Sequence, residues 1–140
     1  MAHDYTQTVR SFYDAFTHLD APRFIALLHP NVEWFAAEGL LYTDHSPYVG
    51  PEAVRGLIFD RLIADWDDLS VTATEILGRD DLVIASGRFR GTYKGNGASL
   101  DAQLVQVFQF TDGKIAKVQV YADTAQFKDS ISQIRAAGTL

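Results

Sequence analysis

The second half of the chain alternates between apolar and polar residues, and only short turns interrupt it. Four stretches show this pattern, at 71–77, 81–94, 99–110 and 114–122. A period of two residues turns one side of a strand toward the core, so each stretch is predicted to be a β-strand. The turns between them are too short for the crossover that parallel neighbours need. The pattern therefore predicts consecutive antiparallel strands arranged as a meander.

The first half of the chain has a helical period instead. Asp4 is a suitable N-cap for a first helix, whose apolar residues recur at helical spacing. These residues are Tyr5, Val9, Phe12, Tyr13 and Phe16. A second, short helix is predicted to begin at Asp20 and to end before Pro30, and a third begins at Pro51. Helices followed by strands indicate the α+β class.

Shorter elements are predicted around these helices. Residues 31–37 have the composition of a strand, 39–43 form a candidate second strand, and 44–50 form a loop with Pro47 and Gly50. A last helix is predicted to begin at residue 123 or 124. A helix laid across a curved antiparallel sheet leaves an apolar mouth, and such mouths bind small molecules.

Composition limits the classes of function. The chain has 140 residues, which suits a single domain over residues 1–140, and it carries a net charge of −6, which disfavours a nucleic-acid partner. No apolar run is long enough to cross a bilayer, and the first ten residues lack a signal-peptide pattern, so we expect no membrane partner and a cytoplasmic protein. The four histidines lack ligand spacing and there is no phosphate-binding glycine loop, so no metal or cofactor is expected.

The order of elements resembles the nuclear transport factor 2-like cone. Within that superfamily, several motifs resemble the SnoaL-like branch, which is related to polyketide cyclases and ketosteroid isomerases. The matching motifs are FYDAF, NVEW followed by AEG, PYVGPEAV, GRFRGTYKG, and FTDGKI followed by YADT. The resemblance implies a conical α+β barrel, in which a curved antiparallel or mixed sheet wraps around N-terminal helices. It also implies a homodimer packed sheet to sheet, but no single function, because this fold serves both enzymes and binding proteins.

Three residues are singled out by comparison with the isomerase pattern. A tyrosine on the first helix of those enzymes donates a hydrogen bond to the developing oxyanion, and Tyr13 has the corresponding place; the alternative is a core aromatic. Trp34 stands where the aspartate base would be, and it cannot take a proton. Gln106 replaces a protonated aspartate and can still donate a hydrogen bond; the alternative is a shifted register that leaves it exposed.

Glu38 is the candidate for proton transfer. It shares the alternation of Trp34 and Ala36, so it points into the pocket if the strand runs on without a bulge, and an apolar pocket would raise its pKa. The alternative is a solvated residue at the end of the strand. Members of this family often read WHEAEG here, whereas this chain reads WFAAEG and lacks the histidine and the first acid.

The remaining candidates are residues that would surround a ligand. Trp34, Tyr42 and Phe108 are expected to form the walls, Leu104 shares the strand face of Gln106, and His45 lies in a loop at the expected mouth. These residues predict binding of a small, largely apolar organic molecule. Two functions stay open: cofactor-independent acid–base chemistry of the isomerase, cyclase or dehydratase type, and a non-catalytic ligand-binding or dimerisation module.

A homodimer through the outer face of the sheet is predicted from the last two strands. Both carry apolar residues at many positions, and four valines are too many for one face to bury: Val105, Val107, Val118 and Val120. An apolar surface of that kind usually marks an interface between proteins.

Overall fold

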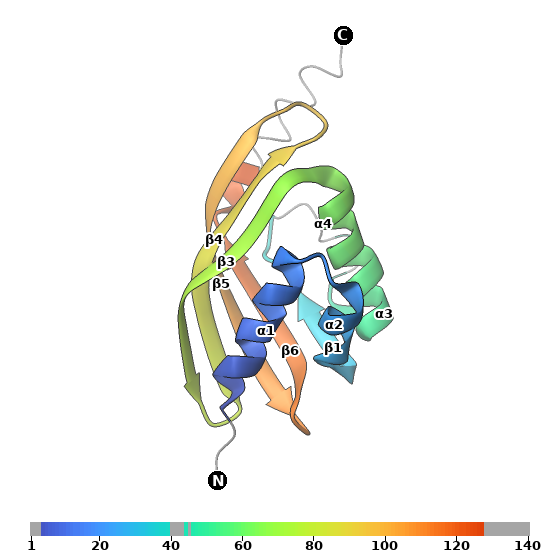
Figure 1. Cartoon of the computed structure of the whole chain (residues 1–140), viewed down its shortest axis with the longest axis vertical. Coiled ribbons are helices and arrows are strands. Elements are labelled where there is room, and N and C mark those ends of the chain that lie inside the picture. The colour runs from blue at the N-terminus through green and yellow to red at the C-terminus, as the bar shows by residue number, and fades with distance from the viewer. Residues whose placement is uncertain (1–3, 40–43, 45, 128–140) are drawn as a thin grey trace.

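The structure, a computed structural model, describes residues 4–39, 44 and 46–127. In chain order its elements are α1 (Tyr5–Thr17), α2 (Ala21–Ala26), β1 (Leu28–Phe35), β2 (Tyr48–Val49), α3 (Pro51–Val54), the π-helical segment η1 (Arg55–Phe59), α4 (Asp60–Asp65), β3 (Trp66–Arg79), β4 (Leu82–Tyr93), β5 (Ser99–Thr111) and β6 (Lys114–Ala122). Residues 124–127 form a helical turn. The predicted α+β class is confirmed, with N-terminal helices beside one curved sheet (Figure 1).

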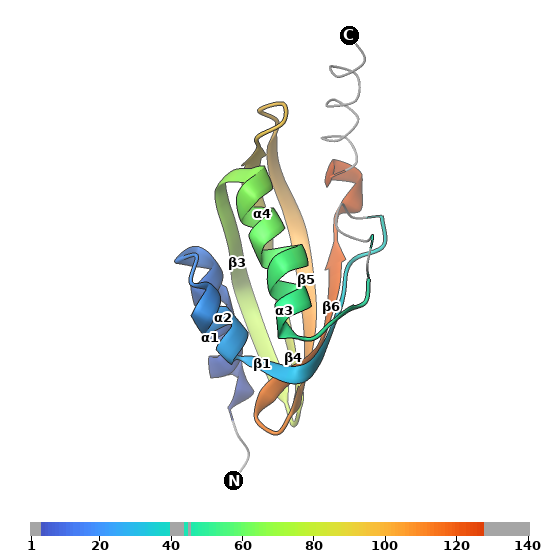
Figure 2. The same cartoon turned by 90° about the vertical axis from the view of Figure 1, so that its right-hand side faces the viewer.

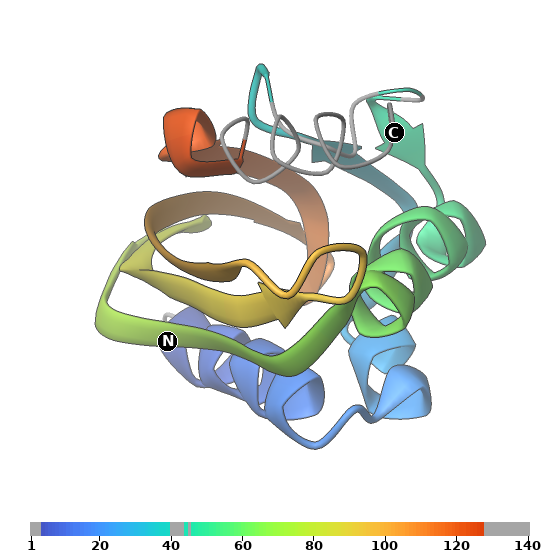
Figure 3. The ribbon, with the colours of Figure 1, turned by 90° about the horizontal axis from the view of Figure 1, so that it is seen from above.

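The sheet has six strands in the order β2-β1-β6-β5-β4-β3. Strands β3 to β6 form the predicted antiparallel meander. Strand β1 adds to it in parallel with β6, and β2 pairs antiparallel with β1, so the sheet is mixed. Seen from above, its long strands curve strongly without closing into a barrel (Figure 3). The helices cover one side of this curved sheet (Figures 1 and 2).

Several predicted boundaries differ from the observed ones. The first strand ends at Phe35, two residues earlier than expected. The short strand β2 lies in the segment predicted to be a loop, and the candidate strand at 39–43 lies mostly outside the described residues. The third helix begins at Pro51 as predicted, but a π-helical turn divides it, and Figure 2 shows α3 and α4 in line on either side.

The first two helices, α1 and α2, are capped and packed as the sequence predicts. The carboxylate of Asp4 accepts a hydrogen bond from Thr6 N at 3.1 Å, and that of Asp20 accepts one from Arg23 N at 3.1 Å. At the centre of the core, the fully buried ring of Phe12 packs against five other aromatic rings, with centroids 5.1–5.9 Å away. Those rings belong to Tyr13, Phe16, Phe24, Trp34 and Phe108. These contacts hold α1 and α2 on the sheet. None of the described helices is both long and apolar enough to cross a membrane.

The four valines of β5 and β6 lie on different faces of the sheet. Val118 and Val120 are buried on the inner face, so the expectation that all four valines compete for burial is wrong. Val105 and Val107 do lie on the outer face, half-buried. Strand pairing places them next to three exposed side chains, and we call these five residues the outer apolar patch: Leu77, Ile84, Val105, Val107 and Tyr121.

Candidate functional site

A cavity of about 60 Å³ lies between the sheet and the helices, near the ends of α1 and β6. Its lining comes from α1, β1, η1, α4, all four strands of the meander and the turn at 124–127. The lining residues are Phe16, Trp34, Ala36, Ile58, Leu62, Val71, Phe89, Leu104, Gln106, Val120, Ala122 and Phe127. Among the described residues that line the cavity, eleven are apolar and only Gln106 is polar. The space exceeds what one water needs, about 10–15 Å³, so it can admit a small organic group.

Gln106 lies on the inner face of β5 with an exposed fraction of 3%. The predicted alternation is therefore confirmed: Ala102, Leu104, Gln106 and Phe108 are all buried. The register shift that would expose Gln106 does not occur, while Gln103 and Gln109 do face solvent. Among the described residues, Gln106 is the one buried side chain that carries an amide or a charge.

Tyr13 holds the amide of Gln106 from the side of α1. Its hydroxyl donates a hydrogen bond to Gln106 Oε1 at 2.6 Å, with both side chains buried. Burial raises the pKa of Tyr13, because the phenolate would lose its hydration, so the hydroxyl stays protonated and acts as a donor. Tyr13 itself is not among the residues that line the cavity. Tyr13 therefore contacts Gln106 without lining the cavity itself.

Of the residues predicted to surround a ligand, some line the cavity and another lies in the core. Trp34 and Leu104 line the cavity. Phe108 is fully buried against Phe12 and is absent from the lining, so it belongs to the aromatic core beside the cavity. Tyr42 and His45 lie outside the described residues.

Glu38 lies elsewhere than the alternation suggested. Strand β1 ends at Phe35, and the chain turns before Gly39, where φ is +79°. Glu38 is consequently exposed and borders a separate hollow with Ala37 and Gln119. The expectation that Glu38 is buried in the apolar pocket is wrong, because a period of two applies only while the strand continues. Its role in proton transfer stays a prediction.

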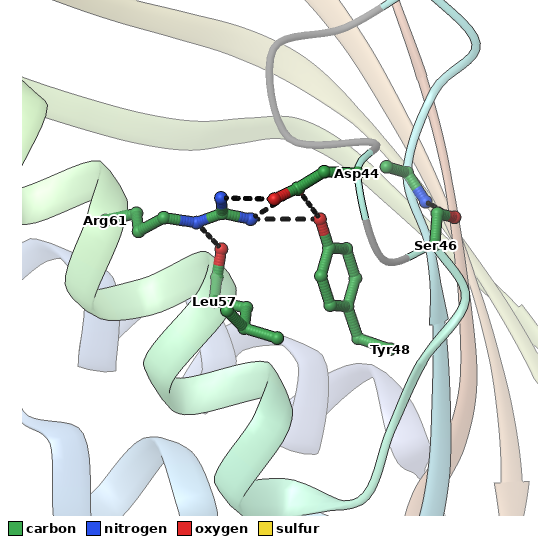
Figure 4. A network of polar contacts seen from close by, with 6 residues as sticks. Asp44, Ser46, Tyr48, Leu57 and Arg61 are labelled. Atoms are coloured by element: carbon green, nitrogen blue, oxygen red, sulfur yellow. Dashed lines mark hydrogen bonds and ion pairs between the residues drawn. The ribbon is translucent and has the colours of Figure 1, made fainter.

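A polar network supports the wall formed by α4 (Figure 4). The guanidinium of Arg61 donates to both carboxylate oxygens of Asp44, at 3.1 and 3.0 Å, and to the hydroxyl of Tyr48 at 3.0 Å. Tyr48 in turn donates to Asp44 Oδ1 at 2.9 Å. These hydrogen bonds, above all the one from Arg61, hold the pKa of Asp44 well below its usual range. The network joins α4 to residues that follow β1.

The segment that contains Asp44 and Tyr48 also contacts Ala36, the residue that follows β1. Ser46 Oγ accepts a hydrogen bond from the backbone N–H of Ala36 at 3.2 Å (Figure 4), and Ala36 lines the cavity. Sequence reasoning singled out neither Arg61 nor Asp44, because an ion pair between distant segments leaves no local pattern. It also left Ile58 and Leu62 as a plain apolar stripe, although their spacing of four residues does place both on the cavity side.

The site carries no sign of a metal centre in the part of the chain that the structure describes. No three side chains among histidine, aspartate and glutamate gather there as metal ligands would. What the cavity offers chemically is an apolar enclosure with one amide, whose orientation is set by a protonated tyrosine.

Comparison with known proteins adds solved structures of the same fold. An NTF2-like protein from Burkholderia thailandensis is 25% identical and matches with a TM-score of 0.84 over 90% of this chain and 95% of that one. TerC, crystallised with polyporic acid, is 20% identical, with a TM-score of 0.78 over 88% and 94%. IdmH, a candidate polyketide cyclase from Streptomyces antibioticus, is 20% identical, with a TM-score of 0.77 over 93% and 99%.

No protein with curated annotation matches the sequence. The profile of the SnoaL-like domain family, in contrast, matches residues 9–118, which span α1 to the middle of β6. This region contains the cavity's helical wall and most of its sheet wall, and it agrees with the fold of the solved structures. The chain belongs to the SnoaL-like domain family.

Proposed function

We propose that the protein binds a small, largely apolar organic molecule in the cavity between the helices and the sheet. One observation carries this proposal: of the described residues that line the cavity, eleven are apolar and the remaining one, Gln106, is a hydrogen-bonding amide. Ligand sites commonly combine an apolar enclosure with a few placed polar groups that fix orientation. TerC, which has the same fold, was crystallised with polyporic acid, and this supports the proposal at the level of the fold.

The size of the cavity bears on the ligand. Protein interiors are normally packed without voids much larger than a water molecule. A space of about 60 Å³ beside a tightly packed aromatic core is therefore unusual, and it is only partly enclosed, so a ring compound can place one edge in it and extend toward the open side. Bicyclic compounds such as indane are larger than this space, so they would extend through its open side or displace side chains of the lining.

Indane, a neutral bicyclic hydrocarbon, provides a direct test. Binding is measured by ligand-observed NMR with wild-type protein, Leu104→Trp and Val105→Trp. Leu104 lines the cavity, whereas its neighbour Val105 lies on the outer face of the same strand. We expect Leu104→Trp to abolish binding, because the larger side chain fills the space, and Val105→Trp to leave it unchanged. Equal binding by two variants that keep the wild-type circular dichroism spectrum would refute the proposal.

A catalytic role for Glu38 is the second candidate. Glu38 borders a hollow that shares Val120 and Ala122 with the cavity, so a ligand that extends past these two residues would approach the carboxylate. In that arrangement Glu38 would transfer protons from the rim, with Gln106 as the polar anchor and Tyr13 behind it. The test is turnover of enones, epoxides and polyketide-like ketones. Glu38→Gln should abolish turnover and spare binding; unchanged turnover would exclude Glu38 as the base.

We also propose that the protein is a homodimer through the outer face of its sheet. The outer apolar patch supports this, because three of its members have exposed fractions of 41–66%. Strand pairing aligns Leu77, Ile84 and Val107 across three neighbouring strands. Contiguous apolar surface of this kind usually serves an interface between proteins.

A further inference from the structure

The orientation of the Gln106 amide follows from its contact with Tyr13. The buried Tyr13 hydroxyl must donate its hydrogen to an acceptor, and Gln106 Oε1, at 2.6 Å, is the acceptor that the described residues supply. If the amide were reversed, its nitrogen would face the hydroxyl, and the tyrosine hydrogen would lose that acceptor. Tyr13 therefore fixes which end of the amide is free.

The free end is the amide nitrogen. Within the described part of the chain, Gln106 Nε2 makes no hydrogen bond. It is not fully enclosed either, since Arg55 Nε is the one sealed side-chain nitrogen or oxygen without a partner among those residues. Gln106 is the polar residue of the described cavity lining, so the cavity is the space from which an acceptor could reach these amide hydrogens. A polar group kept in this position is satisfied only when a water or a ligand supplies an acceptor.

We propose that Tyr13 makes Gln106 a dedicated hydrogen-bond donor, and that the cavity thereby selects uncharged ligands with a carbonyl-type acceptor over matched ligands that only donate. This inference rests on the proposed binding function. No charged side chain is found among the described residues that line the cavity, and a carboxylate ligand held by these residues would lose its hydration without gaining a cation. In this assignment Gln106 contacts the ligand, and Tyr13 is a positioning residue that acts through Gln106.

Three bicyclic probes of similar size separate the possibilities: 1-indanone, which only accepts; indole, which only donates through N–H; and indane, which does neither. With the wild-type protein we expect 1-indanone to bind roughly threefold to tenfold more tightly than indane, the gain of one net hydrogen bond. Indole should show no such gain. Bound 1-indanone should also show a lowered carbonyl stretching frequency in the infrared, as a hydrogen-bonded carbonyl does.

Two variants test the separate roles of the pair. Gln106→Leu should abolish both the preference for 1-indanone and the infrared shift, while indane still binds. Tyr13→Phe should release the amide to turn, so that the preference for 1-indanone falls and indole gains affinity. A purely structural role for Tyr13 would weaken all three probes alike. If Gln106→Leu does not fold, the wild-type series and its infrared signal still decide the outcome.

The two proposals fail in different ways. Equal binding of 1-indanone and indane, with no infrared shift, would overturn the donor assignment and leave the cavity as a binding site. A gain for indole in the wild-type protein would also overturn it, because the amide would then present its oxygen. If none of the three probes binds the wild-type protein, or if Leu104→Trp binds them as the wild type does, the proposed function fails and this inference fails with it.

Discussion

Gly87 is the position at which the neighbouring backbone leaves no room for a side chain. It lies on β4 opposite an irregularity in β3, where the pairing shifts between Ala73 and Glu75. A Cβ atom added to Gly87 would lie 1.7 Å from the carbonyl oxygen of Thr72, far inside van der Waals contact. Only glycine permits this close approach of the two strands, which is typical at a β-bulge.

Gly87→Ala should therefore destabilise the fold by at least about 2 kcal/mol, the usual cost of forcing atoms into a packed site. Gly56 is the matched control: it lies in η1, and an added Cβ would have no neighbour within 4 Å. Gly56→Ala should change stability by less than about 1 kcal/mol. Urea unfolding of both variants measures the difference, and equal midpoints would contradict the steric argument.

Gln106 and Glu38 illustrate what an alternating pattern can predict about a single residue. Gln106 was placed correctly because β5 continues through it, from Ser99 to Thr111. Glu38 was misplaced because β1 stops at Phe35, three residues before it. Both predictions used the same period of two; only the second assumed where a strand would end. Strand ends depend on turns and on tertiary contacts, which a single sequence specifies weakly.

At the scale of elements, β4, β5 and β6 were predicted to within one residue at each end, since their turns carry recognisable residues, whereas β3 begins five residues before the predicted start. Three features could not be predicted from the sequence. The parallel pairing of β1 with β6 joins segments about eighty residues apart, as their bounds show. Strand β2 is only two residues long, and the π-helical turn in η1 interrupts an ordinary helical pattern. Each of these depends on long-range packing more than on local preference.

The contact between α4 and Asp44 makes stability depend on pH. Hydrogen bonds from Arg61 and Tyr48 lower the pKa of Asp44 in the folded protein. In the unfolded chain an aspartate has a pKa of about 3.9. The stabilisation is therefore fully present above that pH, and it is lost as the pH falls from there toward the lower pKa of the folded state. Because Asp44 is exposed, solvent screening keeps the effect modest.

We expect the stability difference between wild type and Asp44→Asn to be constant from about pH 7 to 5 and to shrink below about pH 4. Urea unfolding at several pH values measures it. Tyr48→Phe is the companion variant: it removes the Tyr48 donor to Asp44 and keeps the pair with Arg61, so it should retain part of the pH dependence. A difference that does not vary with pH would show that the carboxylate charge contributes nothing.

At the scale of the whole molecule, the two faces of the sheet carry different kinds of residues. The inner face supplies the aromatic core and most of the cavity, and its residues are almost all buried. The outer face carries charged pairs, such as Asp101 with Arg88 and Arg90, beside the outer apolar patch. Burying that patch in a dimer would leave the cavity unaffected, because the two lie on opposite sides of the strands.

Ile84 provides the test of the proposed dimer. It lies in the outer apolar patch with an exposed fraction of 41%. In a symmetric dimer every residue of the interface occurs twice, so Ile84→Arg would introduce two charges into one apolar contact. Sedimentation at micromolar concentration should give twice the chain mass of 15.5 kDa for wild type and the single mass for Ile84→Arg.

The control is Leu19→Arg. Leu19 is 53% exposed and lies between α1 and α2, away from the sheet, so this variant adds the same charge at an exposed apolar position outside the patch. It should remain dimeric. Both variants should also bind indane as the wild type does, because neither residue lines the cavity. A wild-type protein that sediments as a monomer, or an Ile84→Arg variant that stays dimeric, would show that the outer apolar patch does not join two copies of this chain.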